Sequence, residues 1–194
     1  MNLDKELKTV PSLLRNIVKN VHAENETFLL QKVKDKWEEI SYKKVLRNAD
    51  AISCYFLEMG IQKGDRLALI IENSPEYVYY DQALQQIGAV NVSIYPTLSE
   101  GEIEYILKDS GARCILTGSS FLFRKILKIA NNCPDLQRII PVFADYEKYL
   151  DKTDLNSGVI HLNDLIAEGL NQIPAFQHQL QQIRNSIQPF DLSS

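Results

Sequence analysis

Residues 64–73 read GDRLALIIEN, a glycine turn followed by a nearly continuous apolar run. A run of this kind, without polar alternation, is typical of a strand that is covered on both faces of a sheet. Helices on both faces supply such cover in α/β proteins. This stretch therefore predicts an α/β fold built on a parallel sheet.

The residues after this strand predict the helix and strand that follow it. Ser74 and Pro75 are a typical helix start, and Gly88 stands where that helix would end. Tyr77 and Tyr80 fall on the side of this helix that we expect to be buried, so packing explains them better than base stacking. Residues 89–94 then predict a second buried strand.

The same alternation continues toward the C-terminus. The spacing from Ser99 to Glu102 is that of a capping box, and Gly111 ends the helix that it opens. Next come an expected strand over residues 113–116, a helix over 119–131 and a strand over 138–143, in which Pro141 indicates a sheet edge or a strand end. Strands alternating with helices predict a Rossmann-like parallel sheet with right-handed crossovers.

An N-terminal helix and a hairpin precede the sheet. Apolar residues recur at helical spacing over residues 10–21, and two short strands are expected over residues 27–33 and 37–42. We expect Trp37, the single tryptophan, to pin this hairpin to the body of the domain. Ser41 caps a further helix that ends at Gly60.

Residues 145–158 are polar and irregular, and a last helix is expected over residues 175–187. The predicted division has three parts. They are an N-terminal helix, hairpin and helix (1–62), a βαβαβαβ subdomain (63–144) and an excursion with a closing helix (145–194).

Composition limits the class of protein. A length of 194 residues is near that of one domain, at roughly 150 residues per domain. The net charge of -4, with scattered basic residues, argues against a nucleic-acid partner.

Cys54, Cys114 and Cys133 lie in apolar surroundings and predict reduced thiols in a core. No secretory signal and no long apolar span is visible, so we expect a cytoplasmic protein. The alternative is a protein bound peripherally to the inner face of a membrane.

Glycine and serine motifs for nucleotide or acyl chemistry are not found. The eight glycines do not match a dinucleotide or phosphate-loop spacing, and there is no G-x-S-x-G elbow. Gly118, Ser119 and Ser120 follow a strand, where a plain helix cap is favoured over an anion site.

The titratable residues indicate no site either. His22, His161 and His178 lack metal-ligand spacing, so no metal site is expected. The pairs Glu38-Glu39 and Glu102-Glu104 are interpreted as solvated charge. No catalytic, cofactor-binding or metal-binding residue is therefore assigned in this chain.

Several segments, taken together, resemble a known family. Residues 64–73, 83–90 and 94–99, in this order and spacing, resemble the opening region of adenylate-forming (AMP-binding) acyl-CoA synthetases. Residues 37–42 look like the early hairpin of that family, and residues 104–113 are similar to a helix and turn that follow. The Ile-Tyr-Pro-Thr form of residues 94–97 is most like the long-chain fatty acid–CoA ligases.

The resemblance implies a reaction and a domain. A fatty acid, ATP with Mg²⁺ and CoA would give acyl-CoA, AMP and pyrophosphate through an acyl-adenylate. The family's working residues lie on a Ser/Thr/Gly-rich loop ending in Pro-Lys-Gly, on a later acidic and aromatic motif and on a C-terminal lid. Residues 189–192 resemble the lead-in to that loop. We therefore expect an incomplete part of the family's large N-terminal domain, inactive on its own, with a second copy or a membrane surface as further partners.

Two other classes remain as alternatives. The chain could be a stand-alone, non-catalytic interaction or small-ligand module that shares the early sheet pattern of the family. A dinucleotide-dependent oxidoreductase matches the alternation of strands and helices but lacks the glycine fingerprint.

Overall fold

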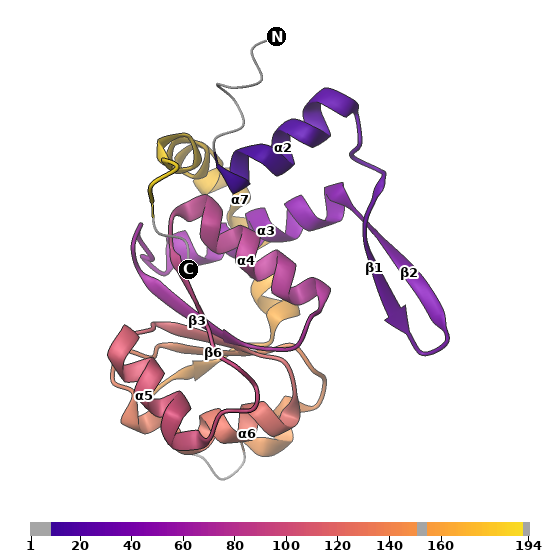
Figure 1. Cartoon of the computed structure of the whole chain (residues 1–194). Coiled ribbons are helices and arrows are strands. Elements are labelled where there is room, and N and C mark those ends of the chain that lie inside the picture. The colour runs from indigo at the N-terminus through magenta and orange to yellow at the C-terminus, as the bar shows by residue number, and fades with distance from the viewer. Residues whose placement is uncertain (1–8, 151–154, 192–194) are drawn as a thin grey trace.

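The computed structural model describes residues 9–150 and 155–191 (Figure 1). Helix α2 (Val10–Val21), the hairpin β1 (Thr27–Val33) and β2 (Lys36–Ser41), and helix α3 (Tyr42–Glu58) come first. The remaining elements are β3 (Arg66–Ile70), α4 (Pro75–Ile87), β4 (Val90–Ser93), α5 (Glu100–Ser110), β5 (Cys114–Thr117), α6 (Ser120–Ile129), β6 (Arg138–Pro141), β7 (Gly158–Val159) and α7 (Leu162–Ser186), with short 3-10 turns η1 (Ala130–Asn132) and η2 (Tyr146–Tyr149).

The central sheet has the strand order β4-β3-β5-β6-β7, and every pair of neighbouring strands is parallel. Strand β3, which contains the apolar run of residues 66–70, lies between β4 and β5. The predicted α/β fold with a parallel sheet and flanking helices is confirmed. Helices α3, α4 and α7 cover one face, and α5 and α6 cover the other (Figure 1).

The alternation of side chains along β3 shows why its sequence is apolar throughout. Leu67 and Leu69 pack against the helices of one face, whereas Ala68 and Ile70 pack against those of the other. These four side chains are at most 2% exposed. A strand in this position has no side that faces water, so polar alternation would place polar groups in a core.

Local capping interactions set the predicted helix starts. The hydroxyl of Ser74 accepts a hydrogen bond from the backbone N–H of Tyr77 at the start of α4, over 3.3 Å. Ser99 and Glu102 form the predicted capping box of α5, and the two helices end at Gly88 and Gly111 as predicted.

The prediction for the last helix was wrong about where it begins. Helix α7 begins at Leu162 rather than near Ala175 and includes Pro174 in its interior. Proline inside a helix costs about 3 kcal/mol because it removes a hydrogen bond and crowds the preceding turn. The apolar stripe begins at Leu162 and Leu165, which are buried in the core that α7 shares with the sheet, and their burial opposes this cost.

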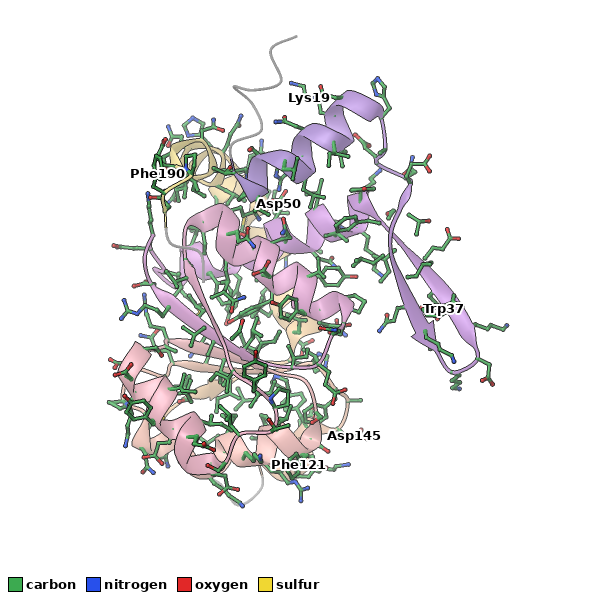
Figure 2. The ribbon with its side chains drawn as sticks, viewed as in Figure 1. Lys19, Trp37, Asp50, Phe121, Asp145 and Phe190 are labelled. Carbon is green, nitrogen blue, oxygen red and sulfur yellow. The ribbon has the colours of Figure 1, made fainter. Side chains whose placement is uncertain are left out.

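The prediction for Trp37 was also wrong. The hairpin extends away from the helices, and the side chain of Trp37 is 65% exposed (Figures 1 and 2). The base of the hairpin is held instead by buried Ile40 and by Phe28, whose ring lies 4.6 Å from that of Tyr42. The hairpin itself formed as predicted, with β1 antiparallel to β2.

Strand β7 was not predicted, because two residues are too few to show a periodic pattern. It pairs with β6, so β6 is not an edge, and Pro141 marks the end of a strand instead. The division of the chain at residues 62 and 144 stays a prediction.

Candidate functional site

The carboxyl ends of β3 and β5 are where a doubly wound sheet of this order binds ligands, because the chain turns to opposite faces there. Helix α4 follows β3 onto one face, and α6 follows β5 onto the other. Residues 71–74 and 118–119 form the two connections at this point.

Close packing fills the space between these two strand ends. A side chain at Gly118 would bring its Cβ to 2.6 Å from Cγ1 of Ile71 and 2.9 Å from its Cα, so only glycine fits. The backbone N–H of Gly118 donates to the carbonyl of Ile70 over 3.0 Å. This backbone donor is therefore used within the sheet and does not face an anion.

An open cleft lies beside this point, over the ends of β3 and β4. We call it the edge cleft; its volume is about 540 Å³. Its lining includes Ile71, Glu72, Tyr77, Ile94, Tyr95 and Pro96.

The lining of the edge cleft is mostly apolar. Ile71 and Ile94 are buried, while the ring of Tyr95 is 76% exposed at the rim. Glu72 is exposed and supplies a carboxylate at the same edge. An apolar surface with a polar rim suits a ligand that has a hydrocarbon or aromatic part.

A polar network behind the edge cleft ties α4 to β4. The carboxylate of Asp81 accepts hydrogen bonds from Gln85 Nε2 over 2.6 Å and from Asn91 Nδ2 over 2.9 Å. Burial raises the pKa of Asp81, and these two hydrogen bonds act in the opposite direction. The network reaches the edge cleft through Ser93, a lining residue whose hydroxyl donates to Asn91 Oδ1 over 3.4 Å.

The tyrosines of α4 pack as predicted. Tyr80 is fully buried, with its ring 5.7 Å from that of Phe56, and Tyr77 packs partly buried against the same core. Burial raises the pKa of the neighbouring Tyr79 to about 12.

The loop after β5 forms a helix cap. The hydroxyl of Ser119 accepts from the backbone N–H of Leu122 over 3.4 Å. The plain cap that was favoured over an anion site is therefore what the structure contains.

The two acidic pairs have separate local partners. Glu102 caps α5, and the hydroxyl and N–H of Ser99 lower its pKa. Glu104 binds Lys108 over 2.6 Å, and Glu39 accepts from the hydroxyl of Thr27 over 2.7 Å.

The histidines and cysteines are dispersed. His22 and His178 are exposed, and His161 caps α7 through Nδ1 and stacks on Tyr146. The three cysteines are free and buried, as predicted.

Residues 9–150 and 155–191 were searched for a metal site and for a membrane-spanning helix. Within them no three His, Cys, Asp or Glu side chains gather closely enough to hold a metal ion. None of the helices in these ranges is both long and apolar enough to span a bilayer.

Sequence reasoning did not identify the lining of the edge cleft. Ile94 was expected only as the last residue of a buried strand, and Tyr95 entered only through the family resemblance. The available signal was their position directly after a buried strand, where parallel sheets bring ligand-facing loops together.

The fold and this open carboxyl edge define a doubly wound α/β protein with room for a small ligand. Comparison with known proteins defines the family. The sequence model described as "AMP-binding enzyme" matches residues 18–176, and the chain belongs to this family.

Curated relatives are ligases of acyl groups to CoA. A long-chain-fatty-acid–CoA ligase of Rattus norvegicus is 32% identical over 109 residues, covering 56% of this chain and 15% of the relative. A mitochondrial medium-chain acyl-CoA ligase of Mus musculus is 28% identical over 137 residues, covering 67% of this chain and 22% of the relative. The chain thus spans less than a quarter of either relative.

Solved structures share the fold. The adenylation domain of a carboxylic acid reductase from Segniliparus rugosus, in complex with AMP and a co-purified carboxylic acid, superposes with a TM-score of 0.70 at 15% identity, over 84% of this chain and 30% of that one. An anthranilate CoA ligase in complex with anthranoyl-AMP gives a TM-score of 0.64 at 24% identity, over 79% of this chain and 27% of that one.

Proposed function

We propose that the chain is the opening part of a long-chain fatty acid–CoA ligase and that these 194 residues do not catalyse the reaction by themselves. The observation that carries the proposal is the family match over residues 18–176. The long-chain assignment is supported by residues 94–97, which are most like that branch and come directly after β4, at the edge cleft.

The proposal does not place ATP or magnesium at the carboxyl ends of β3 and β5. Gly118 is packed against Ile71, and the N–H that could face a phosphate is bonded to Ile70. The carboxylates of residues 9–150 and 155–191 do not gather with other ligand side chains into a cation site. In the proposal, ATP, Mg²⁺ and CoA are held by parts of the whole protein that follow this chain.

The edge cleft is proposed as one wall of the channel for the fatty acyl chain. Its floor of Ile71 and Ile94 can remove methylene groups from water, at about 0.8 kcal/mol for each CH₂ that is fully buried. The ring of Tyr95 extends this surface. Binding to one wall is weak, because only one side of the chain is covered.

Binding of a fluorescent fatty acid tests whether the edge cleft contacts an acyl chain. cis-Parinaric acid is expected to gain fluorescence on mixing with the chain, and palmitate is expected to displace it at roughly a tenfold lower concentration than octanoate, since more methylenes contact the cleft. Tyr95→Ala should weaken binding about threefold by removing contact area.

Tyr105→Ala is the matched control. Tyr105 lies on α5 and is exposed to a similar degree, 67% against 76% for Tyr95, but it does not line the cleft. Equal displacement by octanoate and palmitate would contradict the long-chain assignment. Equal binding by the two tyrosine variants would contradict the place proposed for the wall.

The same proposal includes a cytoplasmic location, contact with the inner face of a membrane, and self-association. The last of these is supported by two exposed apolar side chains of the hairpin, Leu30 and Trp37. Such residues favour association when they form a continuous patch.

A further inference from the structure

A second cleft lies between the helices α2 and α7. Figure 1 shows the C-terminal end of α7, in yellow, beside the start of α2. We call this cleft the α2–α7 cleft; its volume is about 580 Å³. Arg15 and Lys19 line it from α2, and Gln181, Arg184 and Asn185 line it from α7. Because these residues come from opposite ends of the chain, the cleft has no continuous sequence motif.

The cleft carries an excess of positive charge. Among residues 9–150 and 155–191, the charged residues that line the cleft are Arg15, Lys19 and Arg184, and no Asp or Glu of these ranges lines it. Asp50 of α3 opposes this charge: its Oδ1 binds Arg15 and also Arg184, the latter over 3.3 Å. Three cations against one carboxylate leave two positive charges. Asp191, beyond the end of α7, is paired with Lys63 over 2.6 Å.

A buried network fixes the position of Arg15. Its guanidinium donates to Gln86 Oε1 over 2.9 Å, and Gln86 Nε2 donates to the hydroxyl of Ser53 over 2.7 Å. Gln86 and Ser53 are almost completely buried. A guanidinium held in this way loses little freedom when it binds an anion, which favours affinity.

The positive charge and the hydrogen-bond donors of Arg184 are only partly matched by neighbouring acceptors. Its side chain is 15% exposed, and its Nε is buried without a hydrogen-bond partner in the part of the chain that the structure describes. Burial, and then the charge of Arg15, lower its pKa to about 10. A buried cation with an unused donor is costly unless another anion approaches.

We propose that the α2–α7 cleft binds the phosphate dianion of a small phosphorylated molecule. Its charge of about −2 equals the excess in the cleft, and guanidinium groups match its oxygens in geometry. The amides of Gln181 and Asn185 add neutral donors. A monocarboxylate would neutralise half of the excess and is expected to bind more weakly.

Isothermal titration of the 194-residue chain with inorganic phosphate tests the proposal. Phosphate is expected to bind with a dissociation constant of about 1 mM or lower, and acetate at least about threefold more weakly. Raising the ionic strength should weaken phosphate binding, because the cleft is open to solvent.

Two variants should move the affinity in opposite directions. Lys19→Gln removes an exposed cation and should weaken binding about fivefold, whereas Asp50→Asn removes the competing carboxylate and should tighten it about threefold. Lys36→Gln, on the hairpin, is the control and should leave the affinity unchanged. Lys19→Gln and the salt series keep the proposal testable if Asp50→Asn does not fold.

Further titrations identify the source of the phosphate. Glycerol 3-phosphate is expected to bind like inorganic phosphate, and vesicles of phosphatidylcholine with phosphatidate are expected not to retain the chain more than phosphatidylcholine alone. Retention by phosphatidate vesicles alone would overturn the small-molecule source. Absence of binding at about 10 mM phosphate, or equal effects of Lys19→Gln and Lys36→Gln, would overturn the site.

Discussion

Gly169→Ala is expected to lower the free energy of unfolding by about 3 kcal/mol, the upper part of the range for overpacked cores. Gly169 lies where α7 crosses α3. A Cβ there would be 2.0 Å from the carbonyl oxygen of Ala51 and 2.6 Å from its carbonyl carbon. Both atoms belong to the backbone, so a rotamer change cannot relieve the clash and the two helices must separate.

Gly101→Ala is the matched control for that substitution. Gly101 also lies within a helix, α5, but a Cβ there meets no atom within 4 Å. Alanine should therefore stabilise the chain by about 0.5–1 kcal/mol through helix propensity. Urea denaturation of both variants measures the difference, and a Gly169→Ala midpoint equal to that of the unaltered chain would contradict the α3–α7 packing.

Phe123→Ala should destabilise the chain by about 3–5 kcal/mol, the usual range for a buried phenylalanine. Phe123 is fully buried in the core beneath α6. Its ring packs against Phe143, Tyr146 and Tyr149, at 5.6, 6.3 and 6.4 Å between centroids. Its loss would therefore loosen residues 143–150 as well as the sheet, and hydrogen exchange should rise there.

Phe121→Ala provides the comparison from the same helix. Phe121 is 57% exposed and contacts Lys125, with the ammonium 4.8 Å from the ring centroid. Its removal should change stability by less than about 1 kcal/mol, as expected for an exposed cation–π pair. Similar losses for the two variants would mean that Phe123 is not the centre of this core.

The elements of the sheet could be predicted because local signals agree with the tertiary structure. The apolar run of β3 is buried on both sides, and Ser74 and Ser99 cap the helices that they were expected to cap. Periodicity and capping are properties of a few neighbouring residues, so they can be recognised without knowing the fold.

The errors occurred where distant packing decides the outcome. Leu162 and Leu165 continue α7 across Pro174 because α3 and the sheet cover them, which no local rule contains. Trp37 was expected to be buried because it is large and apolar, but the hairpin carries it into solvent.

The two clefts could not be predicted for the same reason. The edge cleft brings residues 71–77 beside residues 93–96, and the α2–α7 cleft joins Arg15 to Arg184 across almost the whole chain. Only the strand order and the packing of α7 on α3 place these residues together.

Acyl-CoA formation by the purified 194-residue chain is the most direct test of the proposed function. With palmitate, ATP, Mg²⁺ and CoA, the proposal predicts no palmitoyl-CoA above the protein-free blank and no ATP–pyrophosphate exchange. Palmitoyl-CoA formation or ATP–pyrophosphate exchange by these residues alone would contradict the account, because groups within this chain would then have to hold the nucleotide.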